Sequence, residues 1–273
     1  MIRRVVGTPA GALGTAIVAL VVIAALFAPW IAPYDPDALS ILERFAPLSP
    51  AHWLGTDQLG RDLLSRLIHG ATVAMGIALT SIAIAAVAGT VLGVVAAFAP
   101  GWIEGAILVV FDIVASFPSL VLALAVVAVF GPGNGFLVAI VAVTLAPQFG
   151  RVARAQVLSL QAAPFLEAER ILGASRLRVF FGHVLPNIAG PLFVLASMEI
   201  PSVITLEAGL SFIGLGVRPP LASWGTLIYD GYSYLSDSTL PVLVSSLALA
   251  VATLGFTLFG EALRDAVDPR GRT

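Results

Sequence analysis

Long apolar stretches alternate with shorter polar ones along almost the whole chain. A helix needs about 20 apolar residues to cross the hydrocarbon core of a bilayer, and several charge-free stretches reach that length. The pattern therefore predicts an all-α polytopic membrane protein with six transmembrane helices. The expected spans lie near residues 5–32, 71–97, 105–130, 136–157, 188–206 and 240–260, the fifth being interrupted by Pro191 and Pro201.

The first apolar stretch has some features of a signal peptide, because it follows two arginines and contains small residues near Ala28. Its apolar core is long enough to span, however, and Leu26 and Pro29 spoil an A-x-A cleavage site after Ala28. We interpret it as an uncleaved anchor. The polar segment that follows, residues 34–69, is predicted to be an extramembrane loop with some short helix.

The arginines predict the orientation of the chain. Cytoplasmic loops carry an excess of basic residues, and a cytoplasmic amino terminus gives ten arginines inside against four outside. We therefore expect both termini and residues 163–186 in the cytoplasm. The ten are Arg3, Arg4, Arg151, Arg154, Arg170, Arg176, Arg178, Arg264, Arg270 and Arg272, and the four are Arg44, Arg61, Arg66 and Arg218.

Composition narrows the function further. The chain is 59% hydrophobic and 11% charged, whereas soluble proteins carry about 25% charged residues. All 14 basic residues are arginine, so the lysine that a phosphate-binding G-x-x-x-x-G-K-[ST] loop needs is missing, and any ATP must be hydrolysed by a partner. A net charge of −2 provides no basic surface for nucleic acid, and the absence of cysteine excludes thiolate chemistry.

Three acidic residues fall inside or beside expected spans, where an aspartate costs about 2.5–3.5 kcal/mol. For Asp112 we favour a structural pairing with Arg151 or Arg154 on the next helix over a role in a transport path. Glu199 and Glu207 suit either the lining of a path or an interhelical hydrogen bond.

Several smaller features carry less weight. Residues 207–217 are glycine-rich, too short to span, and expected to be re-entrant or interfacial. Gly89 and Gly93 suggest either close helix packing or chance. His69 and His183 lack the spaced partners of a metal site, and we regard them as structural. Neither a G-x-S-x-G nor an H-E-x-x-H hydrolase motif occurs.

Residues 163–186 read as two short helices joined by a turn. Pro164 suits a first helical position, Gly173 suits the left-handed residue after a helix end, and Ser175 suits the cap of the next helix. The first helix has an apolar face and a charged one. Periodicity alone allows two interpretations equally: docking into a groove of a partner protein, or lying on the lipid interface.

The same segment resembles the EAA signature of binding-protein-dependent ABC importer permeases, whose loop contacts the ATPase subunit. The resemblance implies that the ATPase-coupling residues are Glu167, Ala168, Glu169, Gly173, Ala174, Ser175, Leu185 and Pro186. Glu169 departs from the alanine that is usual at the third position of the signature. Because it is two residues from Glu167, it points elsewhere around the helix, and we expect the docking face to survive.

Other stretches resemble the second, C-type permease subunit of the dipeptide, oligopeptide and nickel importers. These stretches are residues 31–36, 52–62, 207–217, 224–225 and 263–270. The resemblance implies a type I ABC importer permease fold, with an amino-terminal anchor and loop at 1–69, a transmembrane core at 70–262 and a cytoplasmic tail at 263–273. It also implies a second homologous permease, two cytoplasmic ATPase subunits that hold ATP and Mg, and an extracytoplasmic solute-binding protein as partners.

We therefore predict a permease of the bacterial inner membrane that imports di- or oligopeptides, is not itself an enzyme and binds no cofactor. The alternative is a secondary transporter or channel that acts without ATPases, but the sequence has no convincing internal repeat. An intramembrane enzyme would need an assembled nucleophile or metal pair, which the sequence lacks.

Overall fold

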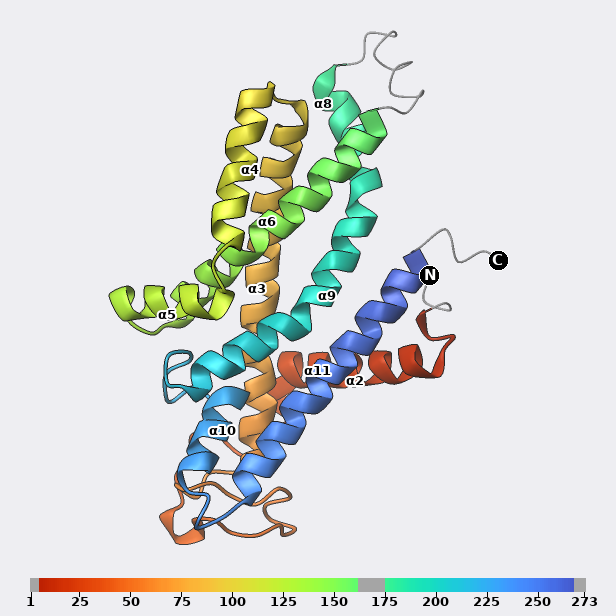
Figure 1. Ribbon diagram of the computed structural model, residues 1–273. Coiled ribbons are helices and arrows are strands. Elements are labelled where there is room, and N and C mark those ends of the chain that lie inside the picture. Colours follow the sequence, from red (N-terminus) through yellow and green to blue (C-terminus); the bar gives the residue numbers. More distant parts are fainter. Residues whose placement is uncertain (1–4, 162–174, 268–273) are drawn as a thin grey trace.

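The computed structural model describes residues 5–161 and 175–267, and within them the chain is built from helices (Figure 1). Five helical segments are long and apolar enough to cross a membrane. They are α2 (Pro9–Ile31), α3 (Leu63–Phe98), α6 (Asn134–Gln161), the segment Phe180–Phe212 that contains α9 (Leu185–Phe212), and α11 (Leu240–Val267).

The expected third span is broken. Instead of one helix over 105–130, the structure has α4 (Gly101–Ala115) and α5 (Ser119–Phe130), which are bent by 84° relative to each other. Pro118 explains the break, because it has no N–H to donate and its ring disfavours helical backbone at Phe117. The count of six spans holds when this bent pair is taken as one span. Figure 1 shows α5 turned across the end of α4.

Helix α3 is the central element, with 36 residues, and it packs most extensively against α6. The contact depends on glycine. A Cβ atom added to Gly89 would lie 2.2 Å from the carbonyl oxygen of Ala146, and one added to Gly93 would lie 2.1 Å from that of Gly150. Both glycines therefore serve close helix packing.

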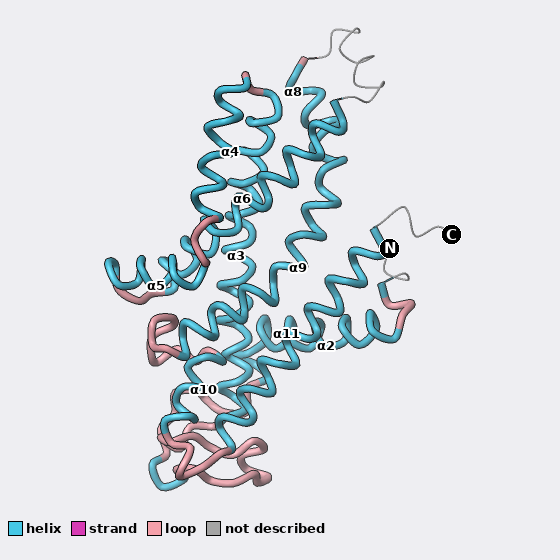
Figure 2. Tube along the Cα trace, viewed as in Figure 1, coloured by secondary structure: helices cyan, strands magenta, loops and turns pink. Residues whose placement is uncertain are grey.

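Helix α3 begins earlier than expected. Residues 63–69 belong to it rather than to the extramembrane loop, because the Asp62 carboxylate accepts a hydrogen bond of 2.8 Å from the Ser65 N–H and caps the helix. The rest of the polar segment is a loop that contains one short 3₁₀ helix, Ile41–Glu43. In Figure 2 this loop and the other long connections gather beside α10 (Trp224–Ser233), at the end of the molecule opposite α8 (Arg176–Val179).

The fifth and sixth spans are longer than expected. Helix α9 continues through Pro191 and Pro201 as far as Phe212, so residues 207–212 are the end of this helix and not part of a separate re-entrant segment. Helix α11 continues past Gly260 to Val267. Each proline removes one backbone donor from the helix, and Thr205 makes an additional hydroxyl bond of 2.8 Å to the Pro201 carbonyl.

Candidate functional site

The expected coupling segment is described only from Ser175 onward. Ser175 is exposed, and its Oγ accepts a bond of 3.3 Å from the Arg178 N–H at the start of α8, as a helix cap does. Residues 180–184 then form one π-helical turn before Leu185 and the exposed Pro186. Glu167, Ala168, Glu169, Gly173 and Ala174 lie outside the described residues.

Two ion pairs join α4 to α6. Asp112 Oδ1 lies 2.7 Å from Arg151 Nη2, which is one of the two partners expected for it. Arg154 pairs instead with Glu104, a partner not expected from the sequence because Glu104 lies just before the predicted third span. The Asp112 and Arg151 side chains are 71% and 47% exposed, so this pair lies on the surface of the isolated chain.

Glu199 bonds to the neighbouring helix α6. Its Oε1 accepts a hydrogen bond of 2.9 Å from Gln148 Nε2. Gln148 is exposed and Glu199 is half-buried. The interhelical hydrogen bond that was one of the two expectations for Glu199 is therefore present, and the partial exposure leaves its carboxylate accessible.

Glu207 is fully buried, and its printed hydrogen bond is made within α9 rather than to another helix. Its Oε1 accepts a bond of 2.7 Å from Ser211 Oγ, which in turn accepts one of 3.0 Å from the Val217 N–H. The carboxylate thus holds the loop 213–223 against the end of α9. A Cβ atom on Gly225 would lie 2.2 Å from the Ala208 carbonyl oxygen, so α10 packs against the same turn of α9.

A second buried polar cluster holds the extramembrane loop. Arg61 Nε lies 2.7 Å from Asp57 Oδ2, and Arg61 Nη2 lies 3.6 Å from Asp230 Oδ2 on α10. Arg66 Nη1 donates to the Pro36 carbonyl at 3.1 Å. In the sequence these residues stood out only through a family resemblance or not at all, since Asp230 and Pro36 are distant in the chain from the arginines that they contact. The cluster fixes the loop to both α3 and α10.

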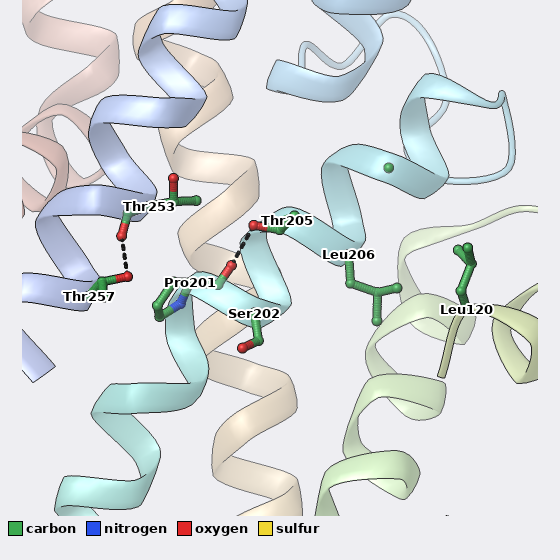
Figure 3. A pocket seen from close by; sticks show the side chains of 8 residues that line it. Leu120, Pro201, Ser202, Thr205, Leu206, Thr253 and Thr257 are labelled. Atoms are coloured by element: carbon green, nitrogen blue, oxygen red, sulfur yellow. Dashed lines mark hydrogen bonds between the residues drawn. The ribbon is translucent and has the colours of Figure 1, made fainter. Parts of the chain in front are cut away.

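Two grooves open on the surface of the transmembrane helices. The first, of ≈ 600 Å³, lies between α5, α9 and α11 (Figure 3) and is lined by Leu120, Pro201, Ser202, Thr205, Leu206, Gly209, Thr253 and Thr257. The second, of ≈ 430 Å³, lies between the α4–α5 bend and α6, and its lining includes Ser119, Thr144, Gln148 and Arg151. No group of three or more histidine, aspartate or glutamate side chains is placed to hold a metal ion within residues 5–161 and 175–267.

A bundle of long apolar helices, with grooves between them and an ordered polar loop at one end, is the architecture of a polytopic membrane protein. Comparison with known proteins gives the family. The family of binding-protein-dependent transport system inner membrane components matches residues 89–273, and the N-terminal TM domain of oligopeptide transport permease C matches residues 1–50. The chain belongs to this family of ABC importer permeases.

Relatives match over almost the whole chain. The di/tripeptide transport system permease protein DppC of Pseudomonas aeruginosa is 41% identical, with 95% of this chain and 88% of the relative covered. The nickel transport system permease protein NikC of Escherichia coli is 36% identical, with 93% and 91% covered. Among solved structures, the inward-facing MetNI methionine ABC transporter matches with a TM-score of 0.60 and 18% identity, over 74% of this chain and 96% of that one.

These matches confirm the expected fold and the class of protein. The chain is a multi-pass inner-membrane permease subunit of a binding-protein-dependent ABC importer. A self-contained secondary transporter, the alternative left open by the sequence, finds no support.

Proposed function

We propose that this chain imports short peptides, forming one half of the translocation path while a second homologous permease forms the other half. The observation that carries the proposal is the 41% identity to a di/tripeptide permease over 95% of this chain. The nickel permease relative, at 36% identity, makes nickel the competing substrate.

Two ATPase subunits are proposed to supply the energy at the cytoplasmic side, by docking on residues 163–186. The chain has no lysine for a phosphate loop of its own. The end of α6 and the start of α8, which flank this segment, lie at the end of the molecule opposite the extramembrane loop (Figure 1). This arrangement is what the arginine distribution requires if both termini are cytoplasmic.

The solute-binding protein is proposed to dock on the extramembrane loop. Ile41, Leu42 and Trp53 are large apolar side chains that this loop leaves exposed, although its polar interior is ordered. Apolar side chains gathered on a rigid surface are typical of a protein contact.

Reconstitution tests these assignments together. Proteoliposomes that contain both permeases and both ATPases should take up a radiolabelled dipeptide only with ATP and the binding protein present. Each component is then omitted in turn. Uptake without the ATPases would contradict the division of labour, and uptake of nickel instead of dipeptide would reassign the substrate.

The coupling segment has its own test. Gly173→Val places a β-branched residue where a left-handed conformation is expected, which costs an ordinary residue about 1–2 kcal/mol. Less ATPase should then co-purify with the permease pair, and Glu167→Lys should act in the same way through charge. Normal ATPase recovery and transport in both variants would assign the segment to the lipid interface instead.

Orientation is tested separately with an impermeant thiol reagent on intact spheroplasts, because the chain has no native cysteine. A single cysteine at Ser49 should be labelled and one at Ser175 should not. The reverse result would invert the topology.

A further inference from the structure

The transmembrane surface of the chain has two kinds of exposed face. On α2 and α3 the large exposed side chains are apolar, as Leu20 and Val87 illustrate with 66% and 67% exposure, and such a face suits lipid. Helix α9 also exposes the apolar side chains of Phe193 and Met198, but one stretch of its surface differs, because Glu199, Ser202, Thr205 and Gly209 are acidic, hydroxylated or small and at least partly exposed. Their spacing of three to four residues puts them on one side of the helix.

The hydroxyl groups of this face present acceptor oxygens. Thr205 Oγ1 donates its proton to the Pro201 carbonyl at 2.8 Å, and Thr257 Oγ1 donates to the Thr253 carbonyl at 2.8 Å (Figure 3). Thr253 Oγ1 likewise donates to the Leu249 carbonyl at 2.9 Å. Because each proton is already used within its own helix, the lone pairs of these oxygens remain for a donor in the groove.

Glu199 adds a charge to these acceptors. It lies one helical turn before Ser202, and its Oε1 is held by Gln148, which lines the second groove. Its Oε2 accepts no hydrogen bond from the part of the chain that the structure describes. A half-exposed carboxylate with a free oxygen is unfavourable against lipid and favourable beside water or a cation.

Glu199 forms no ion pair within the described residues, and the exposed Arg264 of α11, which also packs against α9, is not paired with it. Helices α4, α5, α6 and α9 carry two arginines and four acids within the described residues, and both arginines are paired with the acids of α4. Glu207 is fully buried. Among the charged side chains that the structure describes on α4, α5, α6 and α9, Glu199 is therefore the accessible one without an ion-pair partner. Its negative charge makes this face of α9 favourable for positively charged hydrogen-bond donors.

We propose that this face is a hydrated wall of the translocation path and that Glu199, with the hydroxyl oxygens of the adjacent groove, binds the ammonium group of a passing solute. The inference rests on the proposed function, since the α-ammonium group of a peptide supplies such a cation. A groove of ≈ 600 Å³ is within the range of about 300–1,000 Å³ usual for small-ligand sites. The bond from Gln148 shares the carboxylate, which keeps the site weak enough to release its ligand.

Cysteine accessibility tests hydration and charge at once. The variant Ser202→Cys carries the single thiol of the chain. In the complete complex, a cationic methanethiosulfonate should react with it faster than an anionic one, and Glu199→Gln should lower that rate ratio about tenfold, as expected for loss of one charge about 6 Å away in water. Glu199→Asp should keep the ratio high. Val87→Cys, on the apolar face, is the control and should stay unlabelled.

Two outcomes would overturn the proposal. If Ser202→Cys resists both reagents, the face is packed dry against the second permease. If Glu199→Gln leaves the rate ratio of the two reagents unchanged, another group sets the local charge. Neither outcome depends on peptide being the substrate, so failure of this inference is distinguishable from failure of the proposed function.

Transport gives the functional readout. Glu199→Gln should slow uptake of a dipeptide with an additional side-chain ammonium group at least severalfold more than uptake of an acidic dipeptide. ATPase stimulation by the binding protein should remain, and Glu199→Asp should restore most of the difference. If the Glu199→Gln complex takes up each of the two dipeptides as fast as the native complex does, the carboxylate does not contact the solute. If the native complex moves no peptide, the proposed function fails while the labelling result stands.

Discussion

Two ion pairs in different regions of the molecule have the same chemistry and opposite environments. In the extramembrane loop, the side chains of Asp57 and Arg61 are 2% and 9% exposed, and Arg61 also reaches Asp230 on α10, which is distant in the chain. Between α4 and α6, Asp112 and Arg151 are 71% and 47% exposed. A buried pair must stay intact because each member alone would be an uncompensated charge, whereas an exposed pair in water contributes little. The pair in the extramembrane loop should therefore contribute more to the stability of the fold than the pair between α4 and α6.

The largest effect is expected at the pair in the extramembrane loop. Arg61→Met leaves the buried Asp57 carboxylate without its close partner, and breaking a buried pair costs about 3–5 kcal/mol. Arg66 Nε lies 3.5 Å from Asp57 Oδ2 and still partly compensates the carboxylate, so the loss of stability should be near the lower end of this range. Thermal unfolding of the purified complex and proteolysis of the extramembrane loop measure the change. The control Arg44→Met removes an exposed guanidinium that stacks on Phe45, worth about 0.5–1 kcal/mol. Equal losses in both variants would mean that the burial of Arg61 has no energetic importance.

The next largest effect is expected where Gly93 of α3 packs against Gly150 of α6. Gly93→Ala forces a Cβ atom to within 2.1 Å of the Gly150 carbonyl oxygen, so α3 and α6 must separate, at a cost of about 1–3 kcal/mol. Gly76→Ala is the matched control on the same helix, with no atom within 4 Å, and should stabilise by up to about 1 kcal/mol through helix propensity. Chemical denaturation of both variants gives the comparison. A neutral Gly93→Ala would show that the helices can move apart freely.

An intermediate effect is expected at Glu207. Glu207→Ala leaves the Ser211 hydroxyl without its acceptor and opens a cavity, so unfolding should become easier by about 1–3 kcal/mol. Glu207→Gln keeps an acceptor oxygen and should lose less. Thermal unfolding of the two variants decides the ranking. Equal losses in the two variants would mean that the carboxylate charge, and not the hydrogen bond to Ser211, holds the loop 213–223.

The smallest effect is expected at the exposed pair. Arg151→Ala should cost about 0–1 kcal/mol if Asp112 is in contact with water. Stability of the complex in lipid nanodiscs measures the effect, and Asp112→Asn is the matched control. A loss as large as that of Arg61→Met would place the pair in a dry environment and would remove the contrast between the two regions.

Hydropathy predicted the number and order of the spans because lipid burial depends on composition alone. It missed the 84° bend between α4 and α5 because Pro118 lies inside an apolar run, and a window average does not register one missing N–H. It also placed the start of α3 too late. Ser65 and Arg66 make the first turns polar, and only their partners in the extramembrane loop explain why a helix begins there.

The candidate site was predictable in part. The pairing of Asp112 followed from the positions of charges on adjacent spans. The fate of Glu207 did not, because its burial depends on the loop 213–223 folding back over α9, where Gly216 and Gly225 admit no side chain. The polar cluster of the extramembrane loop was equally hidden from sequence reasoning, since Asp57 and Asp230 come together only in the folded chain.

The length of α3 has a mechanical consequence. Its 36 residues make a rod about 54 Å long, while the hydrocarbon core is about 30 Å thick, so several turns extend beyond the hydrocarbon. Asp62 caps its first turn within the extramembrane loop. Near its other end, the Ala97 carbonyl accepts a bond of 3.1 Å from Gln161, the last described residue before the coupling segment. A shift of the extramembrane loop along the axis of α3 would therefore be passed to the end of α6, next to the proposed coupling segment, provided that the rod does not bend.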